Sequence, residues 1–158
     1  MSVFVGSVTI FHLQPQAVQI QVASSRGLPK LILTGRSSSS LRSTRERLLS
    51  ILKTQKIRLK SLRTTISLTP ALPVSTESHL DLALLVSLLA DYHLYQPNSE
   101  DCFLGEVDLD GRLRSTQDLF YLVWAASSLG YKKVFLPQKS CQKLGFVKNI
   151  ELIGIDHL

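Results

Sequence analysis

The residues that could carry out nucleophilic catalysis gather most tightly at one place in this sequence, at Ser75, Ser78, His79 and Asp81. A serine, a histidine and an aspartate act together when each side chain orients the next, and separate elements of a fold assemble that geometry. Neighbouring residues at the start of one helix do not hold it easily. Ser78 fits better as a helix N-cap, with Asp81 in the first turn, where the helix dipole favours a negative charge. The pattern therefore predicts capping here, not catalysis.

A second group of acidic residues alternates along an expected strand and its turn, at Glu106, Asp108 and Asp110. Carboxylates two residues apart share one face of a strand, as an acid–base pair or a metal site requires. A solvated strand face has the same pattern and is the interpretation we prefer. The histidines are scattered, and the two cysteines, Cys102 and Cys141, stand alone. We therefore expect no metal site, no disulfide framework and two reduced thiols.

Glycine-rich phosphate-binding loops do not occur in the sequence. A Walker A loop needs glycine, four residues, and then Gly-Lys-Ser or Gly-Lys-Thr. The nearest string is Gly35-Arg36-Ser37, and it has Lys30 where the first glycine should be. There is no Gly-x-Gly-x-x-Gly string either. We therefore expect no ATP hydrolysis and no cofactor in this chain alone.

The positive charge of the chain is concentrated in one segment. The 158 residues have a formal net charge of +6, and residues 26–63 contain 11 of the 18 Lys and Arg residues with a single acid, Glu46. That segment has a net charge of +10, and the other 120 residues have a net charge of −4. Such asymmetry indicates a polyanionic partner.

Seven basic side chains of this segment are the candidate contacts to nucleic acid: Arg42, Arg45, Arg47, Lys53, Arg58, Lys60 and Arg63. The first four lie on an expected helix, and Arg58 and Lys60 would share one face of the strand after it. A patch of this kind binds phosphates in a sequence-independent, salt-sensitive way. A solvated cationic face, or contacts to an acidic neighbouring domain or subunit, would give the same pattern. The segment has no aromatic residue, so base stacking is not expected in it.

The hydrophobic pattern positions these residues in one mixed α/β domain. Three strands come first and predict a β-meander because their links are too short for helices, and helices then alternate with strands. The expected strands are 1–13, 18–23, 31–33, 59–68, 103–109, 133–136 and 150–155. The expected helices are 41–53, 80–95, 117–129 and 138–144, and Asp110-Gly111 indicates a hairpin turn. No apolar run approaches the roughly 20 residues of a membrane span, and no signal peptide pattern is present, so we expect a cytoplasmic location.

Several strings follow one another in the order found in one protein family. They are Ser25-Arg26-Gly27-Leu28-Pro29, Arg45-Glu46-Arg47, Thr65-Ile66-Ser67-Leu68-Thr69-Pro70-Ala71, Asp81-Leu82-Ala83, Phe103-Leu104-Gly105-Glu106, Leu109-Asp110-Gly111-Arg112-Leu113-Arg114 and Gly154-Ile155-Asp156-His157-Leu158. Over nearly its whole length the chain resembles the N-terminal domain of the ComM/YifB family of magnesium-chelatase-like AAA+ proteins. The resemblance implies the ribosomal protein S5 domain 2-like fold, shared with the Lon protease catalytic domain and the C-terminal domain of RadA.

The same resemblance implies a function in DNA processing. Proteins of this family are similar to ring-forming helicases that promote branch migration during natural transformation. In them an AAA+ ATPase module, which uses ATP and magnesium, follows this domain. The resemblance therefore implies DNA, further copies of the chain and an ATPase module in cis or in trans as partners. It leaves open whether the chain is a cut domain or a naturally short relative.

The resemblance to Lon-type proteases also bears on peptidase chemistry, because these enzymes pair a serine with an activating lysine. Their serine string corresponds to Glu77-Ser78-His79, and their lysine position corresponds to Phe120. No lysine occurs between Lys60 and Lys132, so the resemblance implies no working dyad. We predict a non-catalytic DNA-binding and oligomerisation domain over residues 1–158. The alternatives are a protein-interaction or ring-assembly module without DNA contact, and a degenerate Lon-like peptidase domain.

Overall fold

The computed structural model describes residues 3–35, 38–71 and 78–158. The main sheet contains β1 (Val3–Phe11), β2 (Gln14–Ser25), β3 (Lys30–Thr34), β4 (Arg63–Thr69), β5 (Asp101–Phe103), β8 (Lys133–Pro137) and β9 (Glu151–Ile155). A separate antiparallel hairpin consists of β6 (Glu106–Val107) and β7 (Leu113–Arg114). The helical elements are α1 (Ser38–Thr54), the 3-10 turn η1 (Ser78–Leu80), α2 (Asp81–Asp91), α3 (Leu119–Ser128) and α4 (Gln138–Leu144). None of the described helices is long and apolar enough to cross a membrane.

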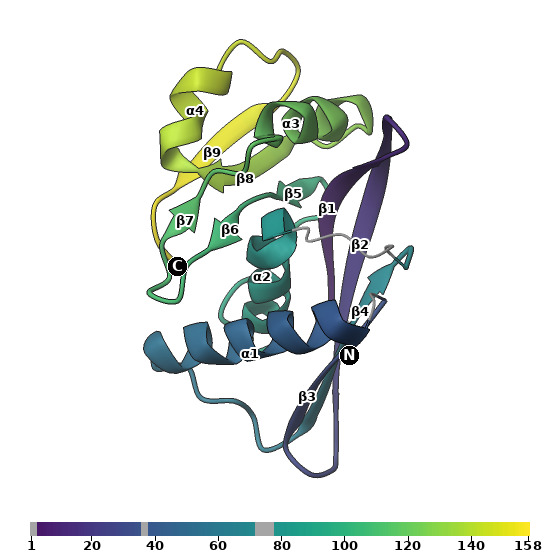
Figure 1. Ribbon diagram of the computed structural model, residues 1–158, viewed down its shortest axis with the longest axis vertical. Coiled ribbons are helices and arrows are strands. Elements are labelled where there is room, and N and C mark those ends of the chain that lie inside the picture. The colour runs from purple at the N-terminus through teal and green to yellow at the C-terminus, as the bar shows by residue number, and fades with distance from the viewer. Residues whose placement is uncertain (1–2, 36–37, 72–77) are drawn as a thin grey trace.

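The main sheet has seven strands in the order β3-β4-β2-β1-β5-β8-β9 (Figure 1). β2 pairs antiparallel with β1 and with β4, and the other neighbouring strands are parallel. The predicted α/β class is confirmed, and every predicted helix is present near its expected position. The predicted hairpin turn is also present, since the N–H of Gly111 donates to the carbonyl of Asp108 at 2.9 Å. The narrower S5 domain 2-like assignment stays a prediction.

The predicted N-terminal β-meander is wrong, because β4 lies between β2 and β3. Arg63, the first residue of β4, pairs with Ser25 on one side and with Lys30 on the other. The link 26–29 therefore passes around the start of β4, and a Cβ placed on Gly27 would lie 3.5 Å from the Cβ of Arg63. β3 and β4 are parallel, and such a pair needs a long crossover connection, which α1 supplies.

Alternation along the strands divides the core between the two faces of the sheet. On one face Val5, Ile20 and Ile66 pack in the same cluster as the buried residues of α1 and α2. On the other face Val8 and Val134 pack with the buried residues of α3 and α4. Figure 1 shows α1 crossing the end of the molecule near β3, while α3 and α4 lie at the end near β8 and β9. The basic helix α1 and the α3–α4 unit are therefore well separated surfaces.

Candidate nucleic-acid interface

The seven predicted basic residues lie on α1, in the link after it and at the first residue of β4. The buried side of α1 has helical spacing and consists of Thr44, Leu48, Ile51 and Leu52. The helix ends in a Schellman motif, in which Lys56 has a φ of 58° and the N–H of Ile57 donates to the carbonyl of Leu52 at 2.9 Å. This motif turns the chain out of the helix and starts the irregular link 57–62.

The prediction that Arg58 and Lys60 share one face of a strand is wrong. β4 begins at Arg63, and both residues lie in the link before it. The link is held by the end of α2 and not by a neighbouring strand, because the N–H of Lys60 donates to the hydroxyl of Tyr92 at 3.3 Å. Without a strand ladder, the alternation that would align Arg58 with Lys60 does not apply.

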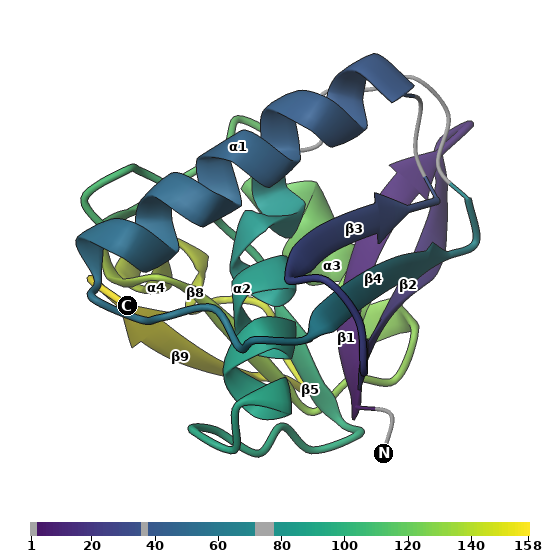
Figure 2. The same cartoon turned by 90° about the horizontal axis from the view of Figure 1, so that it is seen from below.

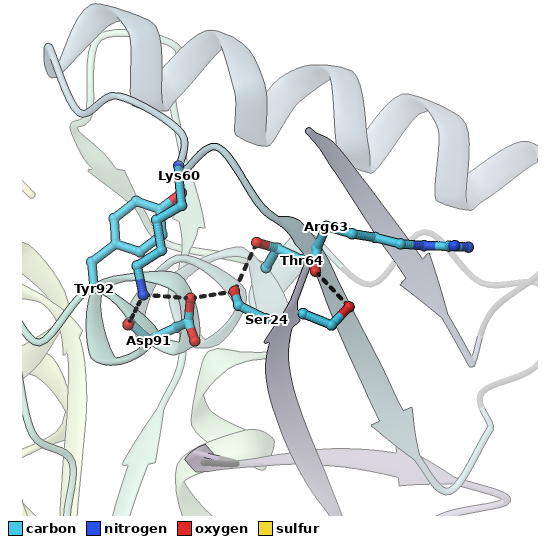
Figure 3. A network of polar contacts seen from close by, with 7 residues as sticks. Ser24, Lys60, Arg63, Thr64, Asp91 and Tyr92 are labelled. Carbon is cyan, nitrogen blue, oxygen red and sulfur yellow. Dashed lines mark hydrogen bonds and ion pairs between the residues drawn. The ribbon is translucent and has the colours of Figure 1, made fainter. Parts of the chain in front are cut away.

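Lys60 belongs to a polar network that joins this link to α2, β2 and β4 (Figure 3). Its ammonium lies 3.1 Å from Oδ2 of Asp91, contacts the carbonyl oxygen of Asp91 and lies 4.9 Å from the centre of the Tyr92 ring. The hydroxyl of Ser24 donates to Oδ2 of Asp91 at 2.8 Å and is 3.0 Å from the hydroxyl of Thr64. Asp91 is buried, so Lys60 neutralises an internal carboxylate.

Arg47 is also held by an internal carboxylate. Its Nη2 lies 2.7 Å from Oδ1 of Asp81, whose side chain is 0% exposed, and its Nη1 lies 4.0 Å from Glu106. Arg42 differs, because its pair with Glu46 at 3.2 Å is exposed and holds the side chain only weakly. Arg47 and Lys60 therefore act as structural cations, and Arg42 remains accessible to a ligand.

Four of the seven predicted residues, Arg45, Lys53, Arg58 and Arg63, make no ion pair with an acid in the described part of the chain. Arg45 and Lys53 are on one side of α1, since residues four apart in a helix are neighbours and Leu49 lies between them. Arg63 lies apart from them. β4 buries Thr64, Ile66 and Leu68 toward α1 and α2, so alternation turns Arg63 to the opposite face.

Two hollows lie along this side of α1, one lined by residues of β3 and one lined by the link after the helix. Figure 2 shows β3 beside α1 and the link leaving the end of the helix. The first has a volume of about 360 Å³ and is lined by Lys30, Leu31, Ile32, Leu33, Leu41, Arg42 and Arg45. The second has a volume of about 660 Å³ and is lined by Leu49, Leu52, Lys53, Lys56, Ile57, Arg58 and Leu59. Each hollow combines apolar side chains with three basic ones. We call the six basic residues, Lys30, Arg42, Arg45, Lys53, Lys56 and Arg58, the α1 flank.

The predicted set of seven residues omitted two members of the α1 flank, Lys30 and Lys56. Lys30 reaches the first hollow because β3 is an edge strand beside α1, which depends on the position of β4 in the sheet. Lys56 reaches the second hollow because it follows the last turn of α1. A local signal existed for Lys56, since the apolar pair Leu52 and Ile57 is the hydrophobic contact that accompanies a Schellman motif.

The predicted N-cap role of Ser78 is wrong. Ser78 belongs to the turn η1, and Leu80 is at the N-cap position of α2, with no side-chain cap. The N–H of Leu82 donates instead to the carbonyl of Gly105 at 3.1 Å, so tertiary structure provides the acceptor that a cap would provide. Asp81 is in the first turn of α2, as predicted.

Two other positions compared with peptidase chemistry are His79 and Phe120. Nε2 of His79 is 3.0 Å from the carbonyl oxygen of Val8, in the interior. Phe120, predicted from the resemblance to stand at the Lon lysine position, is on the outer side of α3 and 38% exposed. Ser75 and Glu77 lie outside the described residues.

The acidic residues of the β6–β7 hairpin are paired with arginines. Asp108 lies 2.6 Å from Arg114, and Asp110 lies 3.3 Å from Arg112. Within the described ranges, no three His, Cys, Asp or Glu residues come together in a way that could hold a metal ion. Cys102 and Cys141 are free thiols, and burial raises the pKa of Cys102 far above its ordinary value.

Comparison with known proteins identifies the family. Residues 20–140 match the family model described as subunit ChlI of Mg-chelatase. The chain belongs to the ChlI family. Its relatives include the DNA repair protein RadA of Bacillus subtilis, 34% identical over 79 residues, which are 50% of this chain and 17% of RadA. RadA of Listeria monocytogenes is 31% identical over 80 residues, which are 51% of this chain and 18% of RadA.

Another relative of this ChlI-family chain is an uncharacterized protein of Mycobacterium tuberculosis. It is 26% identical over 151 residues, which are 94% of this chain and 30% of the mycobacterial protein. The chain thus spans less than a third of the length of these relatives. The family resemblance predicted from the sequence is confirmed at the level of ChlI and RadA, and the narrower ComM/YifB assignment stays a prediction.

Proposed function

We propose that this domain binds DNA through the α1 flank, as the DNA-binding and assembly part of a ComM-like protein that acts in branch migration or recombination during natural transformation. The observation that carries the proposal is a row of basic side chains along one side of α1 without described acidic partners, above all Arg45, Lys53 and Arg58. The name of the relative RadA, a DNA repair protein, supports a role of this kind.

The dimensions of the α1 flank suit a nucleic-acid backbone. Arg45 and Lys53 are separated by about 12 Å along the helix axis, from a rise of about 1.5 Å per residue. Phosphates of one DNA strand follow one another every ~3.4 Å along the duplex axis, so the row would reach several phosphates. No base-reading geometry is required, and the binding is therefore independent of sequence.

The proposal gives this chain no chemical step of its own. It lacks a Walker A loop, and Phe120 stands where a Lon-type protease needs its lysine. ATP and magnesium would act in an AAA+ module joined to this domain or bound by it. The domain would then contribute DNA affinity and self-association, and the energy of ATP hydrolysis would come from that module.

A titration of fluorescent duplex DNA at several salt concentrations tests the proposal. The test variant is Lys53→Gln/Arg58→Gln, because both side chains are exposed and neither has a described ion pair. Each lost phosphate contact should reduce the slope of log affinity against log salt by about 0.9. The control is Arg26→Gln/Arg112→Gln, which removes the same net charge from exposed positions that line neither hollow.

The proposal predicts that the test variant loses affinity and salt dependence while the control keeps both. Affinity that does not change with salt would contradict it. Equal losses in the test and control variants would show that net charge alone, and not the α1 flank, governs binding.

A second candidate function is docking of the α1 flank onto an acidic surface of a neighbouring subunit. The apolar side chains in the hollows favour it, since Leu59 is 40% exposed and a phosphate backbone makes no use of such a surface. Analytical ultracentrifugation distinguishes the two functions. A defined oligomer that dissociates in Lys53→Gln/Arg58→Gln and ignores DNA would favour docking, and a monomer that binds DNA would exclude it.

A further inference from the structure

The outer side of α3 exposes an aromatic surface made of Phe120, Tyr121, Trp124 and Phe146. Tyr121 is 57% exposed, Trp124 48% and Phe146 66%. The inner side of the same helix is apolar and buried, with Leu122, Val123 and Ala126 in the core under the sheet. Residues 120, 121 and 124 fall within about 100° of one another on a helix of 3.6 residues per turn, so they face outward together. The packing of α3 against the sheet therefore leaves these aromatic rings exposed on its outer side.

Three of the four rings of this surface contact one another. The centres of the Phe120 and Phe146 rings are 5.7 Å apart with an interplanar angle of 30°, and Phe120 lies 5.3 Å from Tyr121 in an edge-on arrangement. Phe146 follows α4 in the chain, so two separate segments build the surface. A contiguous exposed apolar patch on a domain is a candidate binding site.

Lysines dominate the charges around the aromatic surface, and one exposed acid, Asp118, stands just before α3. Residues 119–150 contain five lysines and no acidic residue. Lys143 and Lys148 are exposed on either side of Phe146 in the chain, and the carbonyl of Lys148 accepts a hydrogen bond from the hydroxyl of Ser127, near the end of α3, at 3.3 Å. Two copies of this surface placed face to face would bring like charges together, which opposes self-association.

We infer that this aromatic surface binds single-stranded nucleic acid, with bases stacked on Tyr121, Trp124 and Phe146 and phosphates near Lys143 and Lys148. Exposed rings combined with cations are the chemistry that single strands require, because every base has a face that stacks and every nucleotide carries a phosphate. The inference rests on the proposed role in DNA binding and extends it to a second surface. α3 and α1 pack on opposite faces of the sheet, so the two surfaces act separately.

Trp124 is the only tryptophan of the chain, so its fluorescence reports on this surface directly. The probe is oligo(dT) of about 12 nucleotides, a length within the usual site sizes for single strands. Stacking on the indole should quench its emission to a saturating level. An abasic oligomer of the same length keeps the phosphates and lacks the bases, and it should leave the emission unchanged. Oligo(rU) in a parallel titration shows whether the surface distinguishes DNA from RNA.

The matched variants are Tyr121→Ala and Phe4→Ala, which each remove one exposed aromatic ring. Tyr121→Ala should weaken oligo(dT) binding about ten-fold, a loss within the range that one stacked base contributes. Phe4 is 50% exposed on β1 and lines a hollow with Leu94 and Tyr95, outside the aromatic surface, so Phe4→Ala should leave binding unchanged. If Tyr121→Ala does not fold, quenching of the wild-type protein still decides the matter.

No quenching by oligo(dT), or equal quenching by the abasic oligomer, would overturn the inference. A dimer in the wild type that Tyr121→Ala converts to a monomer, without any quenching, would assign the surface to self-association instead. The α1 flank is tested independently, because Lys53→Gln/Arg58→Gln should lose duplex affinity and keep the quenching of Trp124. Failure of duplex binding in the wild type with intact quenching would therefore reject the α1 flank alone.

Discussion

Replacement of Arg47 by methionine should destabilise the fold without removing a DNA contact. The guanidinium lies 2.7 Å from Oδ1 of Asp81, a carboxylate that is 0% exposed. Methionine keeps much of the apolar stem of the side chain and removes its charge. Asp81 would then be a buried charge without the guanidinium, and loss of one partner of a buried pair costs about 3–5 kcal/mol.

The lower end of that range applies here. The Arg47 side chain is 31% exposed, so water weakens the pair, and the N–H of Val107 also approaches Oδ2 of Asp81 at 3.5 Å. We therefore expect a loss of about 3 kcal/mol in the free energy of unfolding. For a chain of this size the melting temperature should fall by about 6–12 °C. Arg42→Met is the matched control, because its pair with Glu46 is exposed and should contribute under ~0.5 kcal/mol.

Urea denaturation followed by circular dichroism measures both variants. The double variant Arg47→Met/Asp81→Asn should regain part of the loss, since it removes the buried charge as well. Under folding conditions Arg47→Met should bind duplex DNA nearly as well as wild type. Full stability of Arg47→Met together with weakened DNA binding would refute the reasoning, because Arg47 would then be a phosphate contact and not a structural cation.

Two further predictions concern the end of α1 and the cysteines. Lys56→Gly should stabilise the protein by under ~1 kcal/mol in thermal unfolding, because Lys56 has a φ of 58°, whereas Lys53→Gly in the last turn should destabilise it by about 1 kcal/mol. A thiol reagent should label Cys141 and spare Cys102, since burial raises the pKa of Cys102. The free energy of unfolding should fall as the pH rises past about 9, because the Cys102 thiol then loses its proton only in the unfolded chain. Rapid labelling of Cys102 in the folded protein would contradict both cysteine predictions.

The helices could be predicted from the sequence because their signals are local. The apolar residues Leu48, Ile51 and Leu52 repeat at helical spacing, and α1 forms where that pattern predicts. The end of α3 is similarly local, since Gly130 adopts a φ of 88° just after the helix. The strand predicted over 59–68 has the correct end and the wrong start. Its first residues contact the end of α2, which no nearby residue signals.

The candidate site could be predicted only as a segment and not as a surface. A count of charges marked residues 26–63, but it could not separate Arg47 and Lys60 from Arg45 and Arg58. That separation depends on Asp81 and Asp91, which lie far along the chain and reach the basic segment only when α2 packs beside α1. The aromatic residues of α3 can be read in the sequence, but their exposure depends on which side of the helix the sheet covers.

The sequence by itself determined the α/β class, the position of each helix, the concentration of positive charge and the ChlI-type family resemblance. These properties follow from local spacing, composition and ordered strings, which need no knowledge of distant contacts. Only the tertiary structure decided that β4 separates β2 from β3, which basic residues are used inside the fold, and that the α1 flank and the aromatic surface face different ways. The physical reason is that strand order and ion pairing join residues far apart in the chain, and their free energies depend on burial that exists only after folding.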